Sequence, residues 1–259
     1  DPLISSNFFS QRKTYSLVSS SQVGFRNYAY VNVTARNEWS STLPEANLSY
    51  FYPSVNGSLI LTQALDIKSN TLSFAKLRGG WSKVGNDADP YKLINTYNFI
   101  ASFGSNPQQS ASNIFLNANL KPEITTSTEL GAEFAFFKNA VRLDVSLYNT
   151  NSIDQILSVD VSPTTGYGQK LINGGKINNK GLEVQLGATP VKSNDFAWDV
   201  SINYSRNHSE VLELDKEADL QSYVLGSDRT VQVLAAVGQP YGTLFGNAYL
   251  RNESGQIIV

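Results

Sequence analysis

Strict two-residue alternation of apolar and polar side chains is the feature that most constrains the fold of this chain. It is clearest between residues 119 and 208, where the stretches 128–136, 141–148, 181–187 and 198–204 each place large apolar groups on one parity. A two-residue period is typical of a β-strand with one apolar and one polar face. The chain is therefore predicted to be all-β.

The earlier part of the chain repeats this pattern less regularly. We expect four further strands there, at residues 14–25, 28–38, 51–61 and 72–85. Arg26-Asn27 is a candidate two-residue turn between the first two. A three-residue break at Lys138-Asn139-Ala140 would separate two later strands.

The connections between the eight strands alternate in length. In chain order they are about 2, 12, 10, 38, 3, 26, 6 and then 50 or more residues, the last lying mostly after residue 208. Outer-membrane barrels alternate short periplasmic turns with long extracellular loops, whereas loops of roughly 25–40 residues are unusual in a compact soluble domain. A soluble sandwich has the same two-residue period. Loop asymmetry therefore favours an antiparallel transmembrane β-barrel, with about eight meander strands in this chain.

Charged residues are segregated by parity. Lys83 and Lys180, near strand ends, are the exceptions on the apolar parity. A lipid-facing Arg or Lys at the membrane midplane costs roughly 2–4 kcal/mol, so segregation is expected of a barrel wall around a wet lumen. The candidates for facing that lumen are Glu129, Glu133, Arg142, Asp144, Glu183 and Asp199. Aromatic residues near strand ends on the apolar parity fit an interfacial girdle: Phe134, Phe136 and Trp198 on one side, and Trp81 and Tyr204 on the other.

Composition excludes several function classes. The net charge of -2 provides no basic stripe for nucleic acid. There is no Cys for a thiolate metal site. The single His, His208, is expected on the polar parity. One His cannot form a multi-His metal site, and it leaves no second choice for a Ser-His-Asp relay. We expect no catalytic residue, metal or cofactor. The chain also has no Met, so we expect a processed chain or an internal fragment.

Three residue groups have both a chemical and a structural interpretation. Asp87 and Asp89 could supply oxygen ligands to Ca²⁺, or simply cap a loop before Pro90. Charged residues expected to face each other across the central hairpin, Glu129/Glu133 against Arg142/Asp144, could as a carboxylate pair suggest glycoside hydrolysis, but ion pairs lining a lumen explain them without catalysis. Loop aromatics could stack on a substrate or pack the loops together: Tyr91, Tyr97, Phe99 and Tyr167.

Several segments together resemble the SusC/RagA family of TonB-linked outer-membrane transporters. In order along the chain they are 30–44 (YVNVTARNEWSSTLP), 49–55 (SYFYPSV), 75–87 (AKLRGGWSKVGND), 120–123 (LKPE) followed by 129–131 (ELG), 173–175 (NGG) with 179–183 (NKGLE), and 237–242 (VGQPYG). The LKPE segment is shared widely among TonB-dependent receptors, whereas RNEWSS and VGND resemble SusC-like members.

This resemblance implies an outer-membrane barrel of about 22 strands, closed by an N-terminal plug and energised by TonB-ExbB-ExbD. It also implies a SusD-like surface lipoprotein as partner, an oligosaccharide or peptide as substrate, and a Gram-negative, Bacteroidetes-type outer membrane. No plug, TonB box or terminal strand can be identified, so residues 1–259 are expected to be a partial barrel domain. Two alternatives stay open: a complete small barrel acting as an adhesin or passive pore, and a soluble carbohydrate-binding or hydrolytic β domain.

Overall fold

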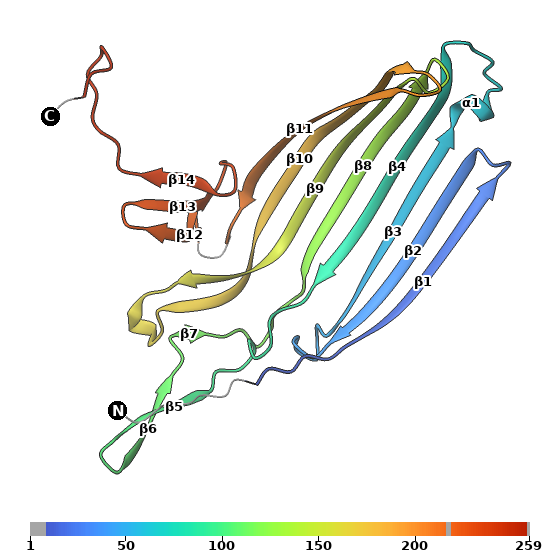
Figure 1. Ribbon diagram of the computed structural model, residues 1–259. Helices are drawn as coiled ribbons and strands as arrows, with labels where there is room; N and C mark the ends of the chain where they lie inside the picture. Colours follow the sequence, from blue (N-terminus) through green and yellow to red (C-terminus); the bar gives the residue numbers. More distant parts are fainter. Residues whose placement is uncertain (1–8, 216–218, 258–259) are drawn as a thin grey trace.

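The main body of the protein is one long antiparallel sheet (Figure 1). The computed structural model describes residues 9–215 and 219–257. Eight strands form a meander in the order β1-β2-β3-β4-β8-β9-β10-β11, and β7 (Ile114–Phe115) adds a short parallel pairing to β10. Their bounds are β1 Thr14–Phe25, β2 Ala29–Ser40, β3 Ser49–Ile60, β4 Leu72–Asn86, β8 Glu123–Phe136, β9 Val141–Asp160, β10 Gln169–Lys192 and β11 Ala197–Glu213. The predicted all-β meander is confirmed.

Short connections lie at one end of this sheet. Arg26 and Asn27 both have positive φ, and the N–H of Tyr28 donates to the carbonyl of Phe25, which closes the predicted turn between β1 and β2. The turn between β8 and β9 also uses left-handed residues, from Phe137 to Asn139. The four-residue helix α1 (Leu61–Ala64) lies in the link from β3 to β4. Within the described ranges, no helix has the length and apolarity needed to cross a membrane.

The sequence predicted a connection of about 26 residues between 152 and 178, and this prediction is wrong. β9 continues to Asp160 and β10 begins at Gln169, so only 161–168 lie outside strands, including the 3-10 turn η1 (Pro163–Thr165). Alternation ends where polar and apolar residues are mixed on both faces of the sheet, but backbone pairing continues; the Asn178 side chain, for example, donates to Asn149 and Asn151 on β9. Hydropathy therefore marked where the apolar face ends and not where the strand ends.

The other long connections also contain structure. The region expected to be irregular between 86 and 122 forms a hairpin of β5 (Tyr97–Phe103) and β6 (Asn106–Ala111), followed by β7. After β11 a second, three-stranded sheet replaces the expected loop, with β12 (Ser222–Asp228), β13 (Val231–Ala236) and β14 (Thr243–Gly246). It is anchored to the end of β11 by a small core of Val211, Leu214 and Ala235.

The apolar face of the main sheet has no second layer over it among the described residues. Leu130, Leu147 and Ile202 on this face are 61%, 53% and 60% exposed. A soluble sandwich would bury such side chains between two sheets, so that alternative does not fit. The sheet is also open, because β1 and β11 do not pair with each other in the part of the chain described. The eight strands therefore form an open sheet and not a closed small barrel.

Candidate functional site

The pairing register separates the two faces of the sheet row by row. One row across β4, β8, β9, β10 and β11 is polar: Lys76, Glu133, Asp144, Gln185 and Asn203. The adjacent row, displaced by one residue, is apolar: Leu77, Ala132, Val145, Val184 and Tyr204. Directly opposed residues share a face of the sheet. The polar face is therefore the place to look for chemistry.

Arg78 on β4 is the centre of the polar face. Its guanidinium donates to both carboxylate oxygens of Asp144, at 2.8 and 2.7 Å, and to Ser146 Oγ at 2.6 Å. Its Nε also lies 3.9 Å from a carboxylate oxygen of Glu129. A bidentate Arg–carboxylate pair fixes both partners in position. This cluster is therefore an ordered network and not a set of independent solvated charges.

Gly131 makes this arrangement possible. It lies on β8 between Arg78 and Ser146 in the register, so the Arg78 side chain must cross over it to reach β9. A Cβ at Gly131 would lie only 2.5 Å from Arg78 Nε and 2.7 Å from Arg78 Cζ. A glycine within a strand often marks such a close approach.

The same device occurs again across the next strands. Tyr148 on β9 crosses over Gly181 on β10, and its hydroxyl bonds the Asn207 side-chain oxygen on β11 at 3.2 Å. A Cβ at Gly181 would lie 2.5 Å from the Tyr148 ring. Long side chains on the polar face thus reach over glycines to tie together strands that are two apart.

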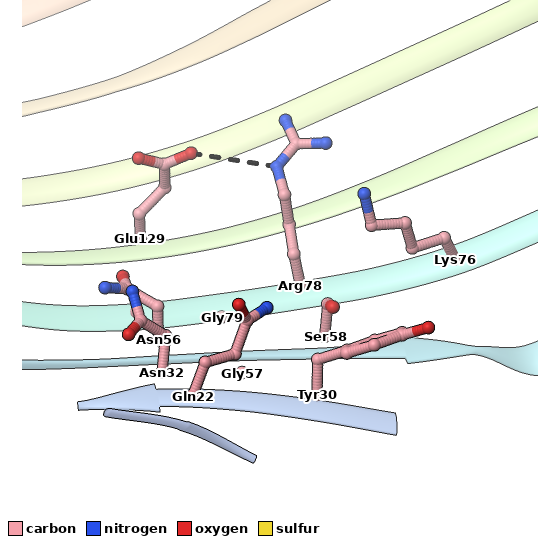
Figure 2. A pocket seen from close by; sticks show the side chains of 11 residues that line it. Gln22, Tyr30, Asn32, Asn56, Gly57, Ser58, Lys76, Arg78, Gly79 and Glu129 are labelled. Atoms are coloured by element: carbon pink, nitrogen blue, oxygen red, sulfur yellow. Dashed lines mark ion pairs between the residues drawn. The ribbon is translucent and has the colours of Figure 1, made fainter. Parts of the chain in front are cut away.

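A hollow of about 250 Å³ lies beside Arg78 on the polar face. Figure 2 shows Lys76, Arg78 and Glu129 on one side of it and amide side chains on the other. Lys76 pairs with Glu133 at 3.7 Å. The amide-bearing residues that complete the lining are Gln22, Asn32 and Asn56. This surface offers many hydrogen-bond donors and acceptors and can bind a polar ligand or a polar protein segment.

The hairpin ion pairs expected from sequence are not formed. Glu133 lies opposite Asp144, and Arg142 lies opposite Ala135. The cations come instead from β4, whose Lys76 and Arg78 have polar parity in the sequence but were not among the candidates. Their parity alone could have identified these two cations. Their partners could not be predicted from a linear pattern, because β4 pairs with β8 and three strands lie between them in the sequence.

The remaining charged candidates lie away from Arg78. Arg142 lies beside Gly187, whose Cβ would be 3.4 Å from Arg142 Nε. Asp199 accepts a 2.5 Å hydrogen bond from Thr189. Glu183 lies in register with Ser146 and Ser205. The structure therefore brings together Glu129, Glu133 and Asp144, and leaves the other three spread along the same face.

A second cluster ties the long connections together. Leu120 is fully buried, packed with Leu43, Tyr50, Ala88 and Leu171. Three of the four residues of the LKPE segment make contacts here: Leu120, Lys121 and Glu123. Lys121 and Asn173 exchange two hydrogen bonds, both 2.8 Å, between the Lys121 backbone and the Asn173 side chain. Glu123 accepts from Asn86 and from the Ile156 N–H.

Asp87 is part of this loop cluster and does not have the surroundings of a calcium ligand. One carboxylate oxygen pairs with Arg12 at 2.5 Å, and the other accepts from Ser40 and from Thr42. Asp89 is exposed. The described residues contain no group of three or more His, Cys, Asp or Glu side chains that could hold a metal ion. The loop-capping interpretation of Asp87 therefore fits its contacts.

Glu38 and Tyr50 form a buried pair beside Asp87. The Tyr50 hydroxyl donates to Glu38 at 2.8 Å, and Arg36 also contacts this carboxylate. Burial raises the pKa of Glu38, but hydrogen bonds from Tyr50 and Tyr52 and the charge of Arg36 outweigh it, so its pKa lies below the ordinary value. Burial and the bond to Glu38 raise the pKa of Tyr50, and the same causes raise the pKa of Tyr52 to about 12. At neutral pH the Glu38 carboxylate is therefore ionised, and both tyrosine hydroxyls are protonated.

The four candidate loop aromatics do not form one site. Tyr97 and Phe99 lie on β5 and are exposed in the β5–β6 hairpin, at the end of the sheet that carries the long connections (Figure 1). Tyr91 accepts a hydrogen bond from the Gln11 N–H. Tyr167 packs on Phe115, with ring centroids 5.0 Å apart, beside an open hollow of about 330 Å³. Tyr167 thus both packs a loop and borders a hollow.

His208 lies on the apolar face, which corrects the expectation that it has polar parity. It is paired with Lys180, and Arg206 is paired with Leu182 on the same face. His208 has the same parity as Ile202 and Tyr204, so alternation along β11 itself places it on this face; the bulge between Ala188 and Val191 lies on β10 and does not change that parity.

Comparison with known proteins agrees with this architecture. The family model described as "TonB dependent receptor-like, beta-barrel" matches residues 2–251. The chain is 27% identical over 239 residues to TonB-dependent receptor P3 of Formosa agariphila, covering 86% of this chain and 23% of that protein. It is 28% identical over 223 residues to TonB-dependent receptor SusC of Bacteroides thetaiotaomicron, covering 81% of this chain and 22% of that protein.

A solved structure has a similar fold. The RagAB peptide transporter matches with a TM-score of 0.79 and 23% identity, over 89% of this chain and 25% of that chain. The chain thus spans about a quarter of the length of each of these three proteins.

Proposed function

This chain belongs to the TonB-dependent receptor β-barrel family, and from that premise we propose that it is part of the wall of an outer-membrane, TonB-dependent importer. Residues 1–259 would be one partial barrel domain. Its polar face, with Glu129, Glu133, Arg142, Asp144, Glu183 and Asp199, would line the lumen, and the opposite face would contact lipid. The long connections would be extracellular.

The separation of charge between the two faces carries this proposal. The Arg78–Asp144–Glu129 network and the Lys76–Glu133 pair share one face. The row of Leu77, Val145, Val184 and Tyr204 lies on the other, without a covering layer in the described parts of the chain. Uncovered apolar rows of this size are stable in lipid, and ionised rows require water.

Adjacent residues on opposite faces provide the test. The chain has no Cys, so a single introduced Cys within it can be labelled alone. The full-length protein, with any Cys elsewhere removed, would be made as Val184→Cys and Gln185→Cys and given a nitroxide label in bilayers. We expect label 184 to collide mainly with oxygen dissolved in lipid, and label 185 with a water-soluble nickel chelate. The reverse result, or equal collision rates, would refute the assignment of faces.

For the whole protein we propose import of an oligosaccharide or a peptide, with a SusD-like surface lipoprotein as partner and energy from TonB-ExbB-ExbD through a plug outside this chain. The similarity to SusC and to the RagAB peptide transporter supports these classes. On this chain, the exposed aromatics at the long-connection end, Tyr97 and Phe99 above all, would contact substrate or partner. Flat exposed rings can stack on sugars or on apolar peptide side chains.

Uptake by cells that carry the full-length protein tests this function. Labelled oligosaccharides and peptides would be offered to cells with and without an intact TonB. We expect TonB-dependent uptake of one class, reduced by the double change Tyr97→Ser/Phe99→Ser and unchanged by Tyr249→Ser, another exposed aromatic near the end of the chain. Uptake that persists without TonB would favour a passive pore.

A further inference from the structure

Two unpaired cations interrupt the apolar face in two successive outward rows of the sheet. On β10 the outward series Leu186, Val184 and Leu182 is followed by Lys180, and on β11 the series Val200, Ile202 and Tyr204 is followed by Arg206. Each cation is therefore the first residue beyond the apolar run of its own strand, on the side of the long connections. On the neighbouring strands β8 and β9 the row of Lys180 holds the neutral residues Thr128 and Asn149, and the row of Arg206 holds Leu130 and Leu147.

Lys180 and Arg206 lie close enough to share one ligand. Lys180 is directly opposite His208, and Arg206 is two residues from His208 on the same face. Diagonal neighbours of this kind are roughly 7–8 Å apart, within reach of long side chains. Together with Leu147, Leu182 and His208 they line an open hollow of about 510 Å³. Its lining, which also includes Tyr148 and Gly181, combines apolar and basic side chains.

Neither cation is neutralised within the described ranges. Every described ion pair of Lys or Arg involves another residue, and no hydrogen bond from the side chain of Lys180 or Arg206 is formed there. The nearest carboxylate on this face, Glu210, lies one step farther from the apolar run and is 3.9 Å from His208 Nε2. An outward side chain keeps its exposure to the membrane when a neighbouring strand is added to the edge of β11.

We propose that Lys180 and Arg206 bind the phosphate group of a phosphorylated lipid in the outer leaflet of the membrane. The inference rests on the proposed function, because that function puts this face in lipid and this end of the sheet outside. Arg and Lys both bind phosphate well, Arg through a planar fork and Lys as a compact charge. An acyl chain of the same lipid would lie along Leu147 and Leu182, which share a row with Arg206, and along Tyr204 in the next row toward the apolar run.

Native mass spectrometry of the purified full-length protein provides the test, with diphosphorylated lipid A as the probe. We expect the double change Lys180→Gln/Arg206→Gln to lower the bound fraction about tenfold or more, since two charge-assisted contacts are lost. The control is Arg26→Gln/Lys138→Gln, which removes the same charge at the short-turn end and should change nothing. Enzymatically dephosphorylated lipid A should bind as weakly to the native protein as the intact lipid binds to the double variant.

Several results would overturn the lipid site. Equal binding of lipid A to the native protein and the double variant would do so, as would equal binding of dephosphorylated lipid. Displacement of lipid by an equal concentration of inorganic phosphate would show a site for a free anion. Retained heat-dependent gel mobility of each variant excludes misfolding as the cause of a loss. Failure of the proposed face assignment would appear separately, in the collision rates of labels 184 and 185.

Discussion

Arg78 on β4 and Asp144 on β9 form a bidentate ion pair across an intervening strand, with N–O contacts of 2.8 and 2.7 Å. The pair is possible because Gly131 on β8 has no side chain where the guanidinium passes. Gly131, which has no side chain, thus controls the contact between Arg78 and Asp144.

Adding one methyl group at this glycine should break the pair. Gly131→Ala places a Cβ within 2.5 Å of Arg78 Nε, so the guanidinium must move from Asp144. Losing charge-assisted hydrogen bonds at a partly exposed site should lower stability by about 1–3 kcal/mol. The thermal midpoint of the full-length protein, read from its gel mobility, would fall. Gly226→Ala, where an added Cβ meets nothing within 4 Å, is the matched control; an equal loss in both would contradict the crossing arrangement.

The two partners should be energetically coupled. Arg78→Gln and Asp144→Asn should together cost less than the sum of the single changes, with a coupling of about 0.5–3 kcal/mol. Arg78→Lys should not rescue the pair, because an ammonium cannot make the two parallel bonds. The same thermal midpoint measures all four proteins of the cycle. Additive effects would mean that the pair forms but has no coupling energy.

Charge should be tolerated on one face and rejected on the other. Val184→Arg puts a cation on the apolar row and should cost roughly 2–4 kcal/mol if that position is near the membrane midplane. Gln185→Arg changes the adjacent residue on the polar row, near Asp144, and should assemble normally. The amount of folded protein recovered in the outer-membrane fraction distinguishes them. Similar recovery of both variants would be evidence against a lipid-facing Val184.

The loop cluster should weaken in alkali. The pKa of Tyr50 is raised, chiefly by burial and by its bond to Glu38. Below pH ~10 the phenol is protonated in both the folded and unfolded states, so its stabilisation is complete. Above pH ~10 the unfolded phenol ionises first, and stability is lost as pH rises toward the folded pKa. We expect a larger fall in thermal midpoint between pH 8 and pH 11 in the native protein than in Tyr50→Phe.

The Tyr50→Phe variant also has an expected effect at neutral pH. It removes one donor from the buried Glu38 carboxylate and should cost about 1.5–3 kcal/mol at pH 8. Tyr28→Phe is the control for loss of a hydroxyl, because Tyr28 lies in the short turn at the far end of the sheet. An identical pH response of the native protein and Tyr50→Phe would disprove the contribution of Tyr50.

Local pattern was enough to predict the eight strands, the short turns and the charged face. A strand with different surroundings on its two sides must alternate, and Arg26-Asn27 can adopt the left-handed turn that joins two of them. The same rule failed from 152 to 178, because polar and apolar residues are mixed on both faces there, as the buried Leu171 and Ile172 show, and alternation disappears while the backbone still pairs. The expectation of polar parity for His208 was wrong for another reason, because counting by twos from Tyr204 already places His208 on the apolar face.

Sequence by itself determined the two chemically different faces, through the two-residue period of residues such as Val184 and Gln185. Only the tertiary structure decided which charges meet. The cations that neutralise Asp144 and Glu133 come from β4, which is separated from β8 along the chain by β5, β6 and β7. Alternation specifies a face but not a neighbour, because pairing depends on register and strand order, and these are set by backbone hydrogen bonds between segments far apart in sequence.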